Sequence, residues 1–218
     1  MIKVIGITSP KIHGDSYKPL SPEEFIVYIA RVSNPSNQLN TATSERLIKY
    51  LIKHKHWSPF EHVSITVEIK TSRAIAAQIL RHRSFTFQEF SQRYSQATEL
   101  ESLHWRTQGK TNRQVGEFDY SLGVVEQGMV DAAQKACLKT YDYLLSVGIA
   151  KECARMILPL NTSTTIYMTG TLRSWVHYLK IRNTKETQKE HRDIANDIQI
   201  ELQKDFPITF NALKPAIL

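Results

Sequence analysis

The chain has 218 residues, of which 41% are hydrophobic, so it can bury the core of one domain or of a compact pair, and disorder is not expected. Its formal net charge of +7 favours anionic partners but does not choose among nucleic acid, a membrane surface and phosphorylated small molecules. The two cysteines, Cys137 and Cys153, argue against a disulfide framework and fit a reducing cytoplasm. The segment from Met1 to Ile7 is too short for a signal sequence, and no run approaches the roughly 20 apolar residues of a membrane span. We therefore expect a soluble cytoplasmic protein.

The first part of the chain predicts a strand and two helices. Residues 2–7 alternate enough between apolar and polar side chains to form the strand. Ser21 is typical of a helix cap, because a proline and two glutamates follow it directly, and this helix is expected to run to about Ser33. A second helix is expected from Ser44, with a buried stripe of Leu47, Ile48, Leu51 and Ile52.

The clearest predicted strand covers residues 63–69 and leads directly into a helix. Apolar and polar residues alternate strictly there, and the apolar face consists of Val63, Ile65, Val67 and Ile69. The residues from Ser72 to Leu80 then suit an amphipathic helix, and its geometry predicts that Gln78 and Arg81 point the same way.

A segment rich in functional side chains follows this helix at residues 81–94. Basic residues in the last turn of a helix are favoured by its dipole by roughly 0.3–1 kcal/mol, which accounts for the first three of them without any function. That account leaves Glu89, Ser91 and Arg93 unexplained. We therefore expect a functional site at this strand-to-helix junction.

The next region predicts a polar loop and then a long helix. Residues 101–118 are polar and poor in pattern, which indicates a surface loop or a lid. Residues 120–147 suit one long helix that stops at Gly148. Its apolar positions recur at helical spacing and are expected to be core: Val124, Val125, Met129, Ala132, Ala136, Tyr141, Leu144 and Leu145.

The last part predicts a short helix, a strand and two longer helices. The short helix covers residues 151–157, and the strand covers residues 164–170. Thr171 is expected to cap a helix that ends near residue 182, and Thr184 a last helix that ends near residue 204. No linker or repeat divides the sequence, so we expect a single domain over residues 1–218.

The histidines before the clearest strand invite a zinc interpretation, which the pattern argues against. His54, His56 and His62 lie close to Glu61, but their spacing lacks the helical His-Glu-x-x-His pair. Pro59 interrupts any helix that would align them. We expect no metal site.

A serine hydrolase and a glycine-loop nucleotide site are also disfavoured. Ser91 has no glycine elbow around it and no aspartate nearby. The chain has only eight glycines and neither a Rossmann fingerprint nor a P-loop, so any dinucleotide is expected to be held by side chains. Arginine suits this task because a guanidinium binds phosphate with two hydrogen bonds, and Arg155, Arg173 and Arg182 are further candidates. Arg173 is expected to share a helical face with His177, and Arg182 to lie near the opposite face.

The central segment resembles the signature of the flavin-dependent thymidylate synthases. It reads Arg81-His82-Arg83, then seven residues, then Ser91, and Glu89 and Arg93 fall where that family has its glutamate and following arginine. Further blocks recur in family order and spacing, so that the resemblance covers roughly residues 20 to 213. They are Ala30-Arg31-Val32-Ser33, His56-Trp57-Ser58-Pro59-Phe60-Glu61-His62, Ala154-Arg155 with Leu158-Pro159-Leu160-Asn161, and Leu172-Arg173-Ser174 leading to Arg182.

This resemblance implies a fold, an activity and an assembly. The expected fold is α+β, with a mixed or antiparallel sheet packed by long helices. The expected activity is the methylation of dUMP to dTMP by an FAD-dependent thymidylate synthase, with methylenetetrahydrofolate as carbon donor and NADPH as the reductant of the flavin. The expected assembly is a homotetramer with active sites between subunits. Neither nucleic acid nor a membrane is an expected partner.

The resemblance also implies site residues. The positions that resemble the family's FAD contacts are Ser58, Arg81, His82, Arg83, Glu89, Thr171, Arg173 and His177. The positions that resemble its dUMP contacts are Gln78, Arg81, Glu89, Ser91, Arg93, Arg155 and Arg182. Arg182 is the expected catalytic residue, because a cation beside the pyrimidine N3 favours the ionised base and raises electron density toward C5. Ser91 is expected to bind rather than to attack, since no adjacent base is evident.

The sequence departs from the family pattern at four positions. Thr171 and His177 stand where some members carry asparagine, Ser58 replaces a frequent threonine, and Gln92 replaces a frequent glycine. Threonine and histidine side chains still form hydrogen bonds with a flavin or its ribityl chain, so the site is expected to survive these changes.

Two other functions remain to be weighed. A nucleic-acid-binding module is suggested by arginines mixed with Phe85, Phe87, Phe90 and Tyr94, which resemble a stacking platform. A polymer groove does not require the carboxylate and amide partners found here at fixed spacing. A flavoprotein without synthase activity would need a broken dUMP set, and that set is complete in this sequence.

Overall fold

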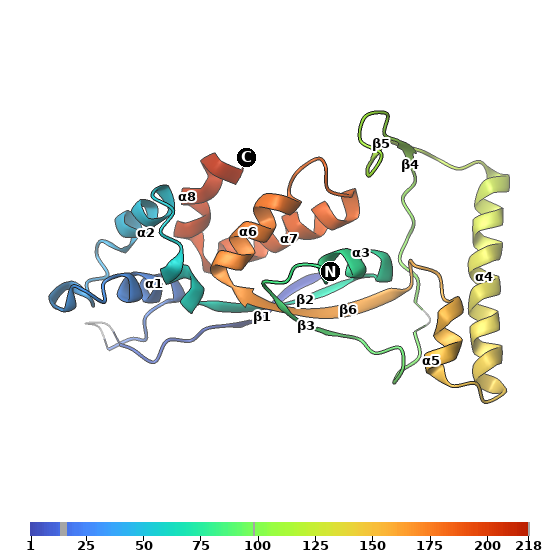
Figure 1. The fold of residues 1–218 in the computed structure, drawn as a ribbon, viewed down its shortest axis with the longest axis horizontal. Helices are drawn as coiled ribbons and strands as arrows, with labels where there is room; N and C mark the ends of the chain where they lie inside the picture. Colours follow the sequence, from blue (N-terminus) through green and yellow to red (C-terminus); the bar gives the residue numbers. More distant parts are fainter. Residues whose placement is uncertain (14–16, 98, 218) are drawn as a thin grey trace.

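Two long antiparallel strands form the centre of the sheet on which the molecule is built (Figure 1). A computed structural model describes residues 1–13, 17–97 and 99–217 of the chain. The central strands are β2 (Ser64–Ser72) and β6 (Ser163–Thr171), which pair in register from Ser64 opposite Thr171 to Ser72 opposite Ser163. The sheet has four antiparallel strands in the order β1-β2-β6-β3, where β1 is Ile2–Ile7 and β3 is Thr86–Glu89.

The alternation predicted at residues 63–69 is confirmed. Val63, Ile65, Val67 and Ile69 are fully buried, while the side chains between them are partly or fully exposed. In a strand alternate side chains point to opposite faces, so one face of β2 is a continuous apolar surface. The expected α+β class is therefore confirmed, and the sheet is antiparallel throughout the described strands.

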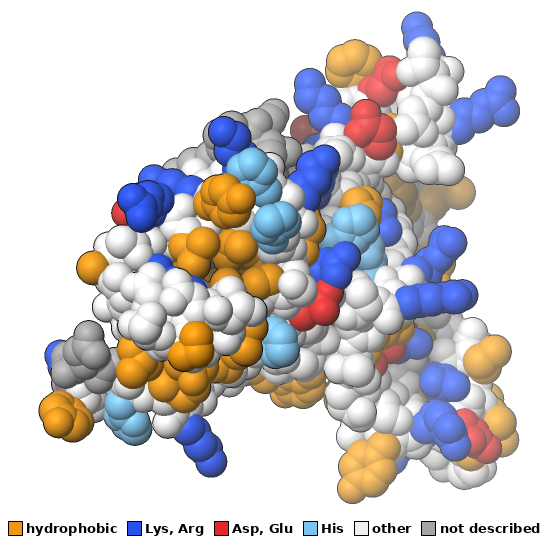
Figure 2. Space-filling model, turned by 60° about the vertical axis from the view of Figure 1, so that its left-hand side comes forward, with side chains coloured by type: hydrophobic (Ala, Val, Ile, Leu, Met, Phe, Trp, Pro, Cys, Tyr) orange, Lys and Arg blue, Asp and Glu red, His pale blue; other side chains and the backbone are white. Residues whose placement is uncertain are grey.

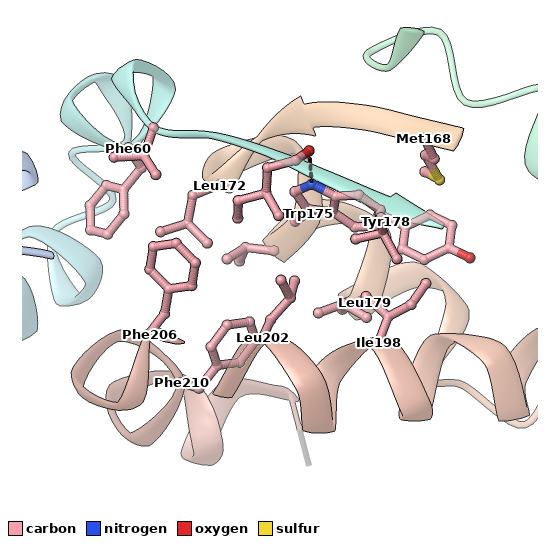
Figure 3. Packing of buried hydrophobic residues seen from close by; sticks show 14 of the residues in the cluster. Phe60, Met168, Leu172, Trp175, Tyr178, Leu179, Ile198, Leu202, Phe206 and Phe210 are labelled. Atoms are coloured by element: carbon pink, nitrogen blue, oxygen red, sulfur yellow. Dashed lines mark hydrogen bonds between the residues drawn. The ribbon is translucent and has the colours of Figure 1, made fainter. Parts of the chain in front are cut away.

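Three helices lie on one face of the sheet and cover its apolar side (Figure 1). They are α3 (Arg73–Ile79), α6 (Leu172–Arg182) and α7 (Lys189–Asp205). Trp175 of α6 is fully buried, and its indole N–H donates to the carbonyl of Ile65 at 3.2 Å (Figure 3). A buried indole needs such a partner, so this bond fixes α6 against β2 as well as filling the core.

Three further helices lie at the end of the sheet from which β2 begins (Figure 1). They are α1 (Pro22–Ala30), α2 (Ser44–Lys53) and α8 (Pro207–Ile217), with the short 3-10 helix η2 (Ser58–His62) beside them. Ile48, Leu51 and Ile52 of α2 are buried and Leu47 packs against the core, as their spacing predicts. Phe60, Phe206 and Phe210 meet Leu202 of α7 in this part of the core (Figure 3).

Side-chain caps start the helices at most of the predicted positions. Ser21 forms a full capping box with Glu24, Ser72 caps α3, and Thr171 caps α6 by accepting a hydrogen bond from the backbone N–H of Ser174. The cap predicted at Thr184 is wrong, since α7 begins at Lys189. The Thr184 hydroxyl instead donates to the carbonyl of Ile181, at the end of the preceding helix.

The long predicted helix forms, but the prediction that its apolar stripe is core is wrong for the first half of the helix. Helix α4 (Val124–Ser146) stands apart from the sheet beside α5 (Lys151–Ala154) (Figure 1). Val124 is 92% exposed, Val125 73% and Met129 69%, and only Tyr141 on this helix is buried. Helical periodicity identifies an apolar face without saying what covers it, and no part of the described chain covers Val124, Val125 or Met129.

The pattern-poor region at residues 101–118 contains a small hairpin. Strands β4 (Arg106–Gln108) and β5 (Gly116–Asp119) pair antiparallel. Arg106 attaches the hairpin to α7 by an ion pair with Glu190 at 2.5 Å, in which the arginine side chain is only 12% exposed. Strands this short contain too few residues for an alternation of apolar and polar side chains to be recognised in the sequence.

Helix α8 was missed by the sequence analysis. Its first turn is bound by Glu23 of α1, whose carboxylate accepts hydrogen bonds from the backbone N–H of Ile208 at 3.2 Å and of Thr209 at 2.7 Å. The Thr209 hydroxyl donates to the same carboxylate at 2.7 Å. Glu23 is buried, so an interaction between remote segments supplies the cap that local sequence lacks. Among the described residues no helix is long and apolar enough to cross a bilayer.

We expect Glu23→Ala to lower the free energy of unfolding by about 2–3 kcal/mol, because three donors at the start of α8 lose a charged acceptor. The midpoint of thermal unfolding measures this change. Glu45→Ala is the matched control, since Glu45 forms an exposed ion pair with Lys49 that should contribute little. Equal shifts for the two variants would contradict the capping role of Glu23.

Candidate functional site

The central segment runs from the end of α3 through β3, and its residues fall into separate environments. Arg81 and Arg83 are exposed, while His82 is half-buried. Because α3 ends at Ile79, Arg81 lies in the turn that follows the helix, where its backbone N–H donates to the carbonyl of Gln78 at 3.4 Å. That Arg81 and Gln78 point the same way stays a prediction. Gln78 is half-buried against α7.

Glu89 is held by an arginine that the sequence analysis did not single out. Arg73 Nη1 donates to Glu89 Oε1 at 2.5 Å, and the Thr164 hydroxyl donates to the same oxygen at 3.0 Å. The glutamate side chain is 16% exposed, so this ion pair is well shielded from solvent. Arg73 begins α3 directly after its cap, a position that gives no hint of a partner sixteen residues later.

His82 and Arg182 meet directly. Arg182 Nε donates to His82 Nε2 at 2.9 Å, so this ring nitrogen must be the unprotonated acceptor. Burial, with the positive charges of Arg182 and His177, lowers the pKa of His82 to about 4. His82 is therefore neutral near pH 7 and orients the guanidinium of Arg182 without competing with it for anions.

A group of polar side chains on α3, α6 and α7 links Gln78 to this pair. Its Nε2 donates to Gln188 Oε1 at 2.7 Å, and its Oε1 lies 3.2 Å from His191 Nδ1. The rings of His191 and His82 are 6.3 Å apart, and that of Tyr178 lies edge-on to His82 at 4.8 Å. Residues 178, 188 and 191 were not identified from the sequence, in which they read as ordinary helix positions.

A pocket of about 530 Å³ lies between η2 and α6. Lys55, Trp57, Glu61, Ser84, Arg173, Ser174, Val176, His177 and Lys180 line it. Arg173 and His177 both face this pocket, which confirms the shared helical face predicted for them. Arg173 forms an ion pair with Glu61, and this contact holds the guanidinium at the wall of the pocket.

Basic side chains contribute to the surface around this pocket. In Figure 2 the end that carries α1, α2 and α8 is turned toward the viewer, and histidine, lysine and arginine side chains lie among apolar ones across the middle of that view. Lys55, Arg173 and Lys180 of the pocket lining are cationic. Such a concentration of cations raises the local concentration of anionic ligands.

The structure places two further residues of the expected FAD set, Thr171 and Ser58. The Thr171 hydroxyl caps α6 and shares a hydrogen bond with the Ser174 hydroxyl at 3.2 Å. Ser58 is exposed at the start of η2. Thr171 thus positions the helix that carries Arg173, whatever further contact its hydroxyl makes.

The remaining arginines of the predicted dUMP set lie beside α5. Arg93 Nε is 3.7 Å from Glu152 Oε2, and Arg155 Nε donates to the backbone carbonyl of Glu152 at 3.3 Å. Lys151 Nζ donates to the Tyr94 carbonyl at 3.0 Å and ties the two segments together. Across residues 1–13, 17–97 and 99–217, no hydrogen bond or ion pair joins this group to Gln78, His82 or Arg182. We call Gln78, His82 and Arg182 the base group, and Ser91, Arg93 and Arg155 the α5 group.

Comparison with known proteins identifies the family of the chain. Residues 17–208 match the family model described as thymidylate synthase complementing protein. The chain is 49% identical over 217 residues to a probable flavin-dependent thymidylate synthase of Paramecium bursaria Chlorella virus 1, with 97% of each chain covered. It is 47% identical over 215 residues to the flavin-dependent thymidylate synthase of Synechocystis sp., covering 98% of this chain and 99% of the relative.

Solved structures share the fold. The UMP/dUMP methylase PolB from Streptomyces cacaoi bound with 5-Br dUMP superposes with a TM-score of 0.79 at 23% identity, covering 99% of this chain and 94% of that one. The same methylase bound with 5-Br UMP gives a TM-score of 0.76 at 25% identity, covering 99% and 93%. The match of the family model over most of the chain, together with these relatives, establishes that the protein belongs to the thymidylate synthase complementing protein family, whose members include the flavin-dependent thymidylate synthases.

Proposed function

We propose that the protein is an FAD-dependent thymidylate synthase that methylates dUMP to dTMP, with methylenetetrahydrofolate as carbon donor and NADPH as reductant. The observation that carries this proposal is the base group. The guanidinium of Arg182 and the amide of Gln78 are each oriented by a neutral histidine, and the two histidine rings lie 6.3 Å apart. Donors and acceptors of this kind match the edge of a pyrimidine. The similarity to named flavin-dependent thymidylate synthases supports the same activity.

The pocket between η2 and α6 fits part of a dinucleotide such as FAD. Its cations offset the charge of a pyrophosphate, and Trp57 supplies an aromatic surface. The Arg173–Glu61 pair holds one guanidinium in place, so less conformational entropy is lost when it binds an anion. Bound FAD supplies the hydride that completes the methyl group.

Arg182 is the side chain that we expect to act on the pyrimidine ring. Its Nε donates to His82, and this hydrogen bond fixes the direction in which the remaining N–H groups of the guanidinium point. A cation beside N3 of the pyrimidine favours the ionised base and raises electron density toward C5, the atom that receives the new carbon. The low pKa of His82 keeps this contact intact at the pH of the reaction.

The division of the dUMP set supports an active site shared between subunits. Arg93 and Arg155 of the α5 group suit the phosphate, and Gln78 and Arg182 suit the base. Because no hydrogen bond or ion pair joins the base group to the α5 group in the described chain, we propose that one subunit supplies the base group and another the α5 group. The exposed apolar face of α4 provides a surface for such an assembly, which we take to be a homotetramer.

The first test is spectroscopic. Purified protein loaded with FAD should bleach when NADPH is added without oxygen, and faster with dUMP present. Arg182→Ala should keep the flavin bands but lose at least about a hundredfold in dTMP formation, because the charge at N3 is gone. Arg46→Ala, at an exposed arginine of α2 outside both groups, is the matched control and should retain activity. A colourless protein that takes up no FAD would contradict the proposal.

The shared site is tested by mixing inactive variants. Gln78→Ala damages the base group and Arg93→Ala the α5 group, so each variant alone should be nearly inactive. Co-expressed subunits should regain roughly a quarter of wild-type dTMP formation, because some mixed sites combine both intact groups. Arg155→Ala mixed with Arg93→Ala is the control and should regain nothing, since both changes fall in one group. Absence of recovery in the first mixture would place both groups on one subunit.

The assembly surface is tested by placing charge on α4. Val125→Glu should reduce the molecular mass measured by light scattering, because an ionised carboxylate is costly to bury between subunits. Ile200→Glu on α7, where the isoleucine is 59% exposed, is the matched control and should leave the mass unchanged. If the two variants keep the same mass as the wild type, α4 is not the interface.

A further inference from the structure

A row of polar side chains leads from the β4–β5 hairpin to Gln78, and an ion pair fixes its direction. Arg106 donates to Glu190 Oε1 at 2.5 Å, and Gln188 Nε2 donates to Glu190 Oε2 at 2.9 Å. Burial raises the pKa of Glu190, but the hydrogen bonds from Arg106 and Gln188 outweigh this effect, and the net pKa is lowered. The carboxylate is therefore ionised and can only accept hydrogen bonds. Gln188 must therefore turn its NH₂ toward Glu190 and its carbonyl toward Gln78.

The amide of Gln78 takes its orientation from this row. With the Gln188 carbonyl 2.7 Å away, Gln78 must present its NH₂ on that side. Its own carbonyl then faces His191 Nδ1 at 3.2 Å, so Nδ1 must carry the proton. If the Gln78 amide turned by half a rotation, its carbonyl would face the carbonyl of Gln188, and its NH₂ would face the N–H of His191.

Tyr178 selects the required form of His191. Its hydroxyl lies 3.0 Å from His191 Nε2, and burial raises its pKa, so it stays protonated and donates. Burial and the charge of Arg182 lower the pKa of His191 to about 3, so the ring is neutral and has a single N–H. That N–H is on Nδ1 because Nε2 accepts from Tyr178. Both side chains are fully buried, which keeps water from replacing either bond.

An amide held in one orientation can distinguish uracil from cytosine, whereas a freely rotating amide cannot. Uracil presents the O4 acceptor beside the N3–H donor, whereas cytosine presents an N4 amine donor beside the N3 acceptor. An amide free to turn by half a rotation satisfies either pattern, but a fixed one satisfies only one of them. Arg182 offers donors alone, and both bases have an acceptor for it at O2, on the carbon next to N3.

We propose that His191, set by Tyr178, is a positioning residue that fixes the Gln78 amide and thereby makes the site prefer a 4-keto over a 4-amino pyrimidine nucleotide. The inference rests on the proposed function, in which Gln78 contacts the base. It assigns a specificity role to two side chains that touch neither substrate nor cofactor. His191 acts through Gln78, and Tyr178 acts through His191.

The test compares dissociation constants for dUMP and dCMP, measured by calorimetry on the FAD-loaded protein. His191→Leu fills a similar volume but donates nothing, so dUMP binding should weaken about tenfold while dCMP binding does not weaken, and the preference should fall about tenfold. His191→Asn returns a donor near the Nδ1 position and should restore most of the preference. Tyr178→Phe keeps the ring and should lower the preference in the same direction.

Two results would overturn the inference and leave the proposed function standing. One is an unchanged dUMP preference in His191→Leu, including equal weakening of both nucleotides, which is the signature of a merely structural histidine. The other is a wild-type imidazole nitrogen NMR spectrum in which His191 carries its proton on Nε2, a measurement that needs no variant to fold. A wild-type protein that binds FAD but has no affinity for dUMP would instead overturn the proposed function, and the inference with it.

Discussion

The antiparallel pairing of β2 with β6 is the constraint on which the site depends. Because each strand runs directly into a helix, the helices α3 and α6 start at opposite ends of the same strand pair. Both lie on one face of the sheet, so α6 runs back toward the end at which α3 begins (Figure 1). The last residue of α6, Arg182, is thereby brought to His82, which follows α3. A shift in the β2–β6 register would separate these two residues without changing either one.

Burial determines how the polar residues of the site behave. His82 and His191 lose their affinity for protons because they are desolvated and lie near Arg182, so both are neutral hydrogen-bonding groups rather than cations. The positive charge of this region is left to the guanidinium, which does not titrate near pH 7. Neutral imidazoles can then fix neighbouring groups by their single N–H and single lone pair. This arrangement separates the residue that supplies charge from the residues that supply orientation.

The described chain also leaves surfaces that a second copy would complete. The apolar side chains in the first half of α4 are exposed, and among the described residues no hydrogen bond or ion pair joins the α5 group to the base group. Both features follow from the extension of α4 and α5 away from the sheet (Figure 1). A site divided in this way would couple activity to assembly, because neither group holds the whole nucleotide. The proposed homotetramer would account for the exposed helix and for the divided site at once.

Local signals in the sequence determined much of this structure. The alternation at residues 63–69 and the caps at Ser21 and Thr171 depend on neighbouring residues alone, so they were predicted correctly. The motif around residues 81–94 identified the family, and the fixed spacing of Arg173 and His177 placed them on one face. Tertiary structure alone decided that the first half of the α4 stripe is uncovered, that Glu23 caps α8, and that His191 and Tyr178 orient Gln78. The physical reason is that each of these features depends on contacts between residues far apart in the sequence. Periodicity and propensity describe neighbouring residues, so they do not indicate which distant residue will be in contact.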